Sequence, residues 1–148
     1  YHIHGAGRDY PWMQEALLRR GLTLGDNGIE VREYIYDMAS ALNACDLIIG
    51  RSGSSISEMN ALLKPAILIP SPNVAGNHQE FNARFVEKCG GAKVILEKDL
   101  TEEILGETVE EILGSKTVYL NMVKGAEKAG RKDATDTLYK IAKELTKS

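Results

Sequence analysis

Segments of strand length alternate with amphipathic segments along the chain. The strand-like segments are 1–4, 29–35, 46–50, 66–70 and 93–97. Two of them, DLIIG and AILIP, are continuous apolar runs, which is typical of strands buried on both faces of a sheet. Apolar residues at helical spacing mark 12–21, 38–44, 54–63, 77–91, 102–114, 116–128 and 134–146. This alternation predicts an α/β fold, a Rossmann-like three-layer sandwich with a mostly parallel sheet.

Capping residues mark the starts of two predicted helices. Asp37 is placed to cap the helix that begins at Met38. Asp99, followed three residues later by Glu102, has the spacing of a capping box before the predicted helix 102–114. Because no linker, repeat or low-complexity tract interrupts the pattern, residues 1–148 are predicted to form a single domain.

Composition narrows the class of protein. The chain has 43% hydrophobic and 26% charged residues with a net charge of −3, which is ordinary for a globular protein and gives no sign of a nucleic-acid partner. No apolar run is long enough to span a membrane. Cys45 and Cys89 lie far apart in apolar-patterned segments without a C-x-x-C spacing. Because no signal peptide is visible, we expect them to be buried thiols of a cytoplasmic protein. The three histidines lack metal-ligand spacing, and no metal or cofactor is predicted.

The most informative stretch is GRSGSSISE (50–58), between a predicted strand and a predicted helix. Glycine allows close backbone approach to a ligand, and N–H groups at a helix start, with serine hydroxyls, favour an anion. Glu58 lies about one turn into the helix, where a carboxylate can accept two ribose hydroxyls. Together these features suit a nucleoside diphosphate. On residue types alone, a helix capped by Ser52 or Ser54 with solvated serines is the favoured interpretation.

Two other strand ends carry polar or exposed groups. SPNVAGNHQEFN (71–82) brings His78 and Gln79, which can hydrogen-bond sugar hydroxyls. YIYDM (34–38) offers the Ile35 backbone to a pyrimidine edge and Met38 to its ring. Taken singly, an exposed loop histidine and plain core packing explain these residues equally well or better. Ligands of doubly wound sheets bind at the carboxyl ends of the strands, where all three segments are predicted to lie.

The chain resembles the C-terminal, donor-binding half of the MurG glycosyltransferases. The resemblance rests on four segments in this order: YIYDM, DLIIGRSGSSISE, LLKPAILIPSPNVAGNHQEFNA and KCGGAKVILEKDL. The resemblance implies the two-domain GT-B fold. It also implies a part in the inverting transfer of N-acetylglucosamine from UDP-N-acetylglucosamine to lipid I, which gives lipid II for peptidoglycan. The parent enzyme would be a cytoplasmic hexosyltransferase, peripheral to the inner face of the plasma membrane.

Carried over by position, the resemblance assigns contacts to this chain. Ile35 and Met38 would contact uracil, Glu58 the ribose, and His78 and Gln79 the sugar. The loop after the strand 46–50 would approach the diphosphate through Arg51, Ser52, Gly53, Ser54 and Ser55. The resemblance supplies no catalytic residue here, because the base and the acceptor site lie in the family's N-terminal half. We therefore expect no transferase turnover from this chain alone.

Two departures from the family pattern bear on these assignments. Gly53 and Glu58 enclose four residues, SSIS, one fewer than the family usually has. One residue turns a helix by about 100°, so either the loop absorbs the change or Glu58 faces away from the ribose. The chain also starts after the family's first strand, glycine-rich loop and helix. It is therefore predicted to be a fragment whose sheet lacks its central strand.

Two alternatives stay open. The architecture is shared by UDP-N-acetylglucosamine 2-epimerases, but these tend to have consecutive glutamates after the loop, where Glu58 is followed here by Met59. The second alternative is a non-catalytic or engineered fragment of the same fold, favoured by the shortened loop and the absent strand.

Overall fold

The computed structural model describes residues 1–22, 25, 28–130 and 143. The strands are β1 (His2–Gly5), β2 (Ile29–Arg32), β3 (Ile48–Gly50), β4 (Ala66–Leu68) and β5 (Ala92–Val94). The α-helices are α1 (Tyr10–Arg19), α2 (Met38–Ala44), α3 (Ile56–Ala61), α4 (His78–Cys89), α5 (Glu102–Leu113) and α6 (Lys116–Ala129). Short 3-10 turns are η1 (Gly7–Asp9), η2 (Ala75–Asn77) and η3 (Glu97–Asp99). The predicted helix 134–146 falls outside the described residues except for Lys143.

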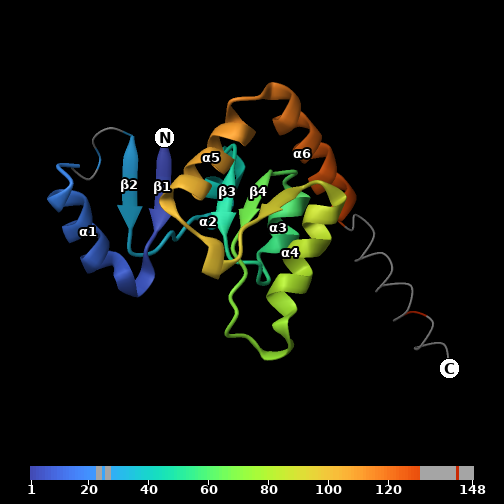
Figure 1. Cartoon of the computed structure of the whole chain (residues 1–148), viewed down its shortest axis with the longest axis horizontal. Coiled ribbons are helices and arrows are strands. Elements are labelled where there is room, and N and C mark those ends of the chain that lie inside the picture. The colour runs from blue at the N-terminus through green and yellow to red at the C-terminus, as the bar shows by residue number, and fades with distance from the viewer. Residues whose placement is uncertain (23–24, 26–27, 131–142, 144–148) are drawn as a thin grey trace. The chain divides into compact units, whose positions relative to one another are not determined.

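The described strands form two parallel sheets. β1 pairs with β2, and β3, β4 and β5 pair in that order (Figure 1). The chain divides into two compact units, residues 1–43 and 44–148, with one sheet in each. The parallel pairing and the alternation of strands and helices are as predicted, whereas the strands are shorter than the apolar runs that indicated them.

In the first unit, α1 packs on the β1–β2 pair. The parallel register places His2 beside Ile29 and His4 beside Val31. Because side chains alternate along a strand, these four residues share one face, where they line a cavity of about 420 Å³ with α1 residues. Val31 is the buried residue of this strand pair. A small sheet with one helix thus forms a modest core of its own.

In the second unit, β4 is the most buried strand. Ala66, Ile67 and Leu68 are 3%, 0% and 1% exposed. Ile67 belongs to a cluster with Ile95, Ile112 of α5 and Met122 of α6, while Ala66 and Leu68 point to the opposite face. Burial of β4 on both faces confirms the interpretation of AILIP as a strand buried on both faces. Full burial of a side chain such as Ile67 contributes about 2 kcal/mol.

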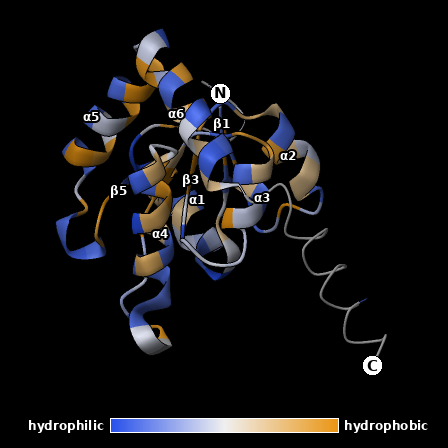
Figure 2. Ribbon diagram, turned by 90° about the vertical axis from the view of Figure 1, so that its right-hand side faces the viewer, coloured by the Kyte–Doolittle hydropathy of each residue, from blue (hydrophilic) through white to orange (hydrophobic). Residues whose placement is uncertain are grey.

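Helix α4 faces the core with small residues. Its buried positions are Ala83 and Val86, whereas Phe81 and Phe85 are 72% and 52% exposed. The i, i+4 spacing of the two phenylalanines therefore marks an exposed face. Hydrophobic and hydrophilic residues alternate around the helices of this unit (Figure 2). Helix α4 packs against α6 and β5, where small side chains permit close contact.

Close approach between α6 and the turn after α4 depends on glycine. A Cβ built on Gly125 would lie 2.1 Å from the carbonyl carbon of Gly90, and one on Gly91 would lie 2.6 Å from the Ala126 nitrogen. Gly90 also adopts φ = +86°, which favours glycine and ends α4. Three glycines therefore fix how α6 crosses the entry to β5.

Of the two helix caps predicted from the sequence, one is confirmed and one is wrong. The carboxylate of Asp37 accepts a hydrogen bond from the Ser40 N–H at 3.0 Å, which confirms it as the cap of α2. The prediction of Asp99 for α5 is wrong, because the N-cap is Thr101, whose hydroxyl accepts from the Ile104 N–H at 3.2 Å. Asp99 lies in the preceding 3-10 turn η3.

Candidate functional site

The loop after β3 ends in a short helix with an open first turn. Helix α3 begins at Ile56, and its N-cap residue Ser55 makes no side-chain capping bond. The interpretation of Ser52 or Ser54 as the cap is therefore wrong. The Gly53 and Ser54 carbonyls accept turn hydrogen bonds, but within the described residues no acceptor meets the N–H groups of residues 53–55. These N–H groups can donate hydrogen bonds to an anionic ligand, and α3 is too short for its dipole to add much.

Ser52 is turned into the protein. It is 0% exposed, and its Oγ donates to the main-chain oxygen of Gln79 at 2.7 Å. Its own carbonyl accepts from Nδ2 of Asn82 at 3.4 Å. Both contacts run to the first turns of α4. The loop after β3 is thus fastened to α4 by the residue directly before Gly53.

Arg51 is also engaged within the protein. Its guanidinium donates to the carboxylate of Glu97 at 2.5 Å and to the Ile69 carbonyl at 3.2 Å. Glu97 lies in η3 after β5, and Ile69 follows β4. Arg51 therefore ties together the carboxyl ends of all three strands of the second sheet, which is where a doubly wound sheet carries its ligand.

The start of α4 is built by a left-handed turn. Gly76 and Asn77 have φ of 62° and 51°, which bends the chain sharply before His78. Gln79 follows, and its side-chain Oε1 accepts the Ser71 N–H at 2.9 Å. Because a backbone N–H is only a donor, this contact orients the amide oxygen toward Ser71. The amide NH₂ of Gln79 is left to donate elsewhere.

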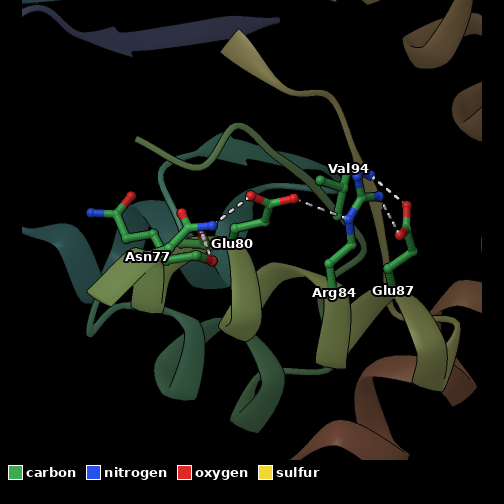
Figure 3. A network of polar contacts seen from close by, with 7 residues as sticks. Asn77, Glu80, Arg84, Glu87 and Val94 are labelled. Atoms are coloured by element: carbon green, nitrogen blue, oxygen red, sulfur yellow. Dashed lines mark hydrogen bonds and ion pairs between the residues drawn. The ribbon is translucent and has the colours of Figure 1, made fainter. Parts of the chain in front are cut away.

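Charged residues along α4 form a chain of contacts (Figure 3). Nδ2 of Asn77 donates to Glu80 at 2.8 Å, and Arg84 lies 3.8 Å from Glu80 and 2.8 Å from Glu87. The hydrogen bond to Glu87 raises the pKa of the Arg84 guanidinium. The second oxygen of Glu87 accepts the Val94 N–H at 3.0 Å, on the outer edge of β5. The network fixes α4 against the sheet and so fixes the place of His78 and Gln79.

A groove of about 720 Å³ runs between α3, α4 and the end of α6. Three predicted site residues, Gly53, Ser54 and His78, line it. The groove continues past Asn82 and Phe85, neither of which was predicted from the sequence as a site residue. The motif HQEFNA contained Asn82, but nothing in its spacing distinguished a loop contact from a solvated amide.

The remaining predicted residues are dispersed. Glu58 is exposed on α3 and does not line the groove. Ile35 and Met38 belong to the first unit, where a Cβ on Gly5 would touch the Ile35 side chain at 3.4 Å. Met38 is 45% exposed at the start of α2. The described geometry thus groups Gly53, Ser54 and His78 on one groove, and the assignments to ligand groups stay predictions.

A sequence profile of the family described as "Glycosyltransferase family 28 C-terminal domain" matches residues 1–138. This chain belongs to that family. The resemblance to the MurG glycosyltransferases inferred from the loop motifs is confirmed by its relatives.

Two curated relatives of this family 28 domain illustrate the similarity. The chain is 44% identical over 121 residues to a UDP-N-acetylglucosamine–N-acetylmuramyl-(pentapeptide) pyrophosphoryl-undecaprenol N-acetylglucosamine transferase of Acetivibrio thermocellus, covering 81% of this chain and 33% of the relative. It is 40% identical over 139 residues to transferase 2 of the same description from Bacillus thuringiensis, covering 93% of this chain and 37% of the relative. The chain thus spans about a third of the relatives it matches.

Solved structures confirm the fold class. The crystal structure of Acinetobacter baumannii MurG matches with a TM-score of 0.78 and 27% identity, covering 96% of this chain and 40% of that one. A kitacinnamycin glycotransferase matches with a TM-score of 0.61 at 21% identity, covering 93% and 34%, which supports the fold alone. The family 28 domain therefore has the α/β architecture of GT-B C-terminal halves, as predicted.

No described helix is both long and apolar enough to cross a membrane. Among the same residues, no group of three or more histidine, cysteine, aspartate or glutamate side chains is arranged to hold a metal ion.

Proposed function

We propose that this chain is the donor-binding part of an inverting glycosyltransferase that moves N-acetylglucosamine from UDP-N-acetylglucosamine to lipid I, forming lipid II. The observation that carries the proposal is the meeting of Gly53, Ser54 and His78 on one groove. Gly53 and Ser54 lie in the loop after β3, and His78 is the first residue of α4, which follows β4 along the chain. The family membership and the activity for which the relatives are named supply the choice of ligand.

The chemistry of the loops suits the two ends of a nucleotide sugar. The free N–H groups of residues 53–55 and the hydroxyls of Ser54 and Ser55 hold the diphosphate. His78 and the amide NH₂ of Gln79, whose oxygen is occupied by the Ser71 N–H, contact the transferred sugar. Arg51 and Ser52, engaged within the protein, hold the loop in place. As UDP leaves, preorganised donors of this kind stabilise the developing negative charge.

The nucleoside end is assigned to other residues. Glu58 accepts the two ribose hydroxyls, while the Ile35 backbone and Met38 contact uracil. The exposure of Glu58 and Met38 leaves both side chains accessible to a ligand.

The catalytic step needs groups outside this chain. An acceptor hydroxyl of lipid I attacks the anomeric carbon as UDP departs, and a base beyond these 148 residues takes its proton. The parent enzyme works at the cytoplasmic face of the plasma membrane, where its acceptor is anchored. The chain alone binds donor without turnover, and lipid II synthesis by the purified chain would contradict this.

A strand and helix outside these residues complete the donor domain. Ile48 donates to Pro65, and Gly50 accepts from Ile69, so Ile49 directs its own N–H and C=O away from β4. No described strand pairs with that edge, and Ile49 is 39% exposed. The β1–β2 pair forms a separate sheet. One additional parallel strand beside β3 would extend this sheet toward that of a Rossmann-type fold.

Calorimetric titration of the chain with UDP-N-acetylglucosamine, with UDP-glucose as the competing ligand, tests the proposal. We expect tighter binding of UDP-N-acetylglucosamine, and a loss of about tenfold in affinity for Glu58→Ala, because a charged hydrogen-bond acceptor is removed. A Glu107→Ala variant, on the exposed side of α5, is the matched control. If neither nucleotide sugar binds, the second interpretation, a non-catalytic fragment, replaces the first.

A further inference from the structure

Ser52, like Arg51, is a residue of the loop that the proposed ligand contacts do not use. Its side chain is 0% exposed, so its hydroxyl cannot reach a molecule in the groove. The hydroxyl donates instead to the main-chain oxygen of Gln79, at 2.7 Å. The neighbouring residue, Gly53, lines the groove. Ser52 therefore stands between the diphosphate end of the site and the residue proposed for the sugar end.

Gln79 is held twice, by two different loops. Its carbonyl receives the Ser52 hydroxyl from the loop after β3, and its side-chain oxygen receives the Ser71 N–H from the loop after β4, at 2.9 Å. The second contact fixes which way the amide is turned, because the backbone N–H of Ser71 is only a donor. The first contact fixes where the backbone of Gln79 lies relative to Gly53.

We propose that the Ser52 hydroxyl is a positioning group that couples the diphosphate-binding loop to Gln79, so that sugar recognition depends on it. This inference rests on the proposed function of the site. Ser52 touches no ligand. It sets the distance between the N–H groups of Gly53 and Ser54 and the amide NH₂ of Gln79, and a nucleotide sugar must reach both groups at once.

The test compares UDP with UDP-N-acetylglucosamine in calorimetric titrations of the chain and of Ser52→Ala. The dissociation constant of UDP divided by that of UDP-N-acetylglucosamine measures the contribution of the sugar to binding. We expect this ratio to fall by about fivefold in Ser52→Ala, the effect of one misplaced hydrogen bond, while affinity for UDP changes less than about twofold. The Gln79 carbonyl keeps its helical hydrogen bond in this variant, so no buried group is orphaned.

Ser115→Ala is the matched control. Ser115 caps α6 in the same unit, and its hydroxyl accepts the Val118 N–H at 3.4 Å. This variant also loses one serine hydroxyl and one hydrogen bond, away from both loops. We expect it to lower the melting temperature to a similar extent and to leave the ratio unchanged. Equal losses of UDP and UDP-N-acetylglucosamine affinity in Ser52→Ala would reduce Ser52 to a structural role and overturn the inference.

Gln79→Glu separates positioning from contact. Glutamate still accepts the Ser71 N–H but lacks the NH₂ donor. If Ser52 acts through Gln79, adding Ser52→Ala to Gln79→Glu changes the ratio no further, whereas additive losses contradict the coupling. If the chain without substitutions binds neither UDP nor UDP-N-acetylglucosamine, the proposed function and this inference are both overturned. Normal binding with an unchanged ratio in Ser52→Ala overturns this inference alone.

Discussion

The guanidinium of Arg51 lies 2.5 Å from the carboxylate of Glu97 and joins the end of β3 to the turn after β5. The two side chains are 52% and 42% exposed, so solvent screens their attraction. Arg51 also donates to the Ile69 carbonyl at 3.2 Å. One side chain therefore makes a screened ion pair and a hydrogen bond to the main chain, and the two contacts can be separated by mutation.

Glu97→Gln is expected to change the free energy of unfolding by less than about 0.5 kcal/mol, because exposed ion pairs contribute little. Arg51→Ala also removes the hydrogen bond to Ile69 and is expected to cost about 1 kcal/mol. Urea unfolding of both variants measures the difference. Equal losses would mean that the ion pair, and not the main-chain contact, secures the loop.

Gly125→Ala is expected to destabilise the protein by about 3 kcal/mol through overpacking. The added methyl group would lie 2.1 Å from the Gly90 carbonyl carbon, where only backbone can give way. Gly106→Ala is the control, because Gly106 lies within α5 with no atom within 4 Å of its Cβ position. Alanine there should stabilise the helix by about 1 kcal/mol. Thermal unfolding that ranks the two variants in the opposite order would refute the close packing of α6.

Thr101→Ala is expected to cost about 1 kcal/mol, because the Ile104 N–H loses its capping acceptor. Asp99→Ala, two residues earlier, removes a carboxylate that makes no capping bond to α5 and should change the free energy of unfolding by less than about 0.5 kcal/mol. Chemical denaturation of the pair decides between the two caps. A larger loss for Asp99→Ala would restore the capping box predicted from the sequence.

Asp37 makes the stability of α2 sensitive to acid. Hydrogen bonds from the Ser40 side chain, and then from its backbone N–H, hold the pKa of Asp37 below its ordinary value. The stabilising contribution is therefore present above about pH 4, the ordinary value, and is lost as the pH falls through the lower folded-state pKa. Carboxyl NMR titration should place the Asp37 pKa below 4 or so and show it rising in Ser40→Ala. An unchanged pKa in that variant would remove Ser40 as the cause.

The sequence predicted those parts of the fold that depend on local pattern. The run AILIP (66–70) indicated a strand buried on both faces, and β4 is that strand. In α4, the spacing of Phe81 and Phe85 correctly indicated a helix but not which face is buried. Spacing is the same whether a stripe faces core or solvent, and here the close approach of α6 selects Ala83 and Val86 for the interior.

The candidate site was predictable as a set of loops but not as a set of contacts. Nothing local distinguishes Ser52 from Ser54, yet Ser52 is fully buried and Ser54 lines the groove. The difference is made by the carbonyl of Gln79, 27 residues further along the chain. Arg51 likewise finds its partner in Glu97, and such long-range pairs follow from the packing of strands rather than from sequence spacing.

The contact between Glu87 and the Val94 N–H has a consequence for self-association. A strand arriving at the outer edge of β5 meets a donor that is already occupied and a carboxylate beside it. Extension of this sheet at β5 is therefore disfavoured in its described part. The strand proposed on β3 would cover the other edge of the same sheet. One carboxylate on α4 thus hinders one of the two edges through which a sheet can grow into a fibril.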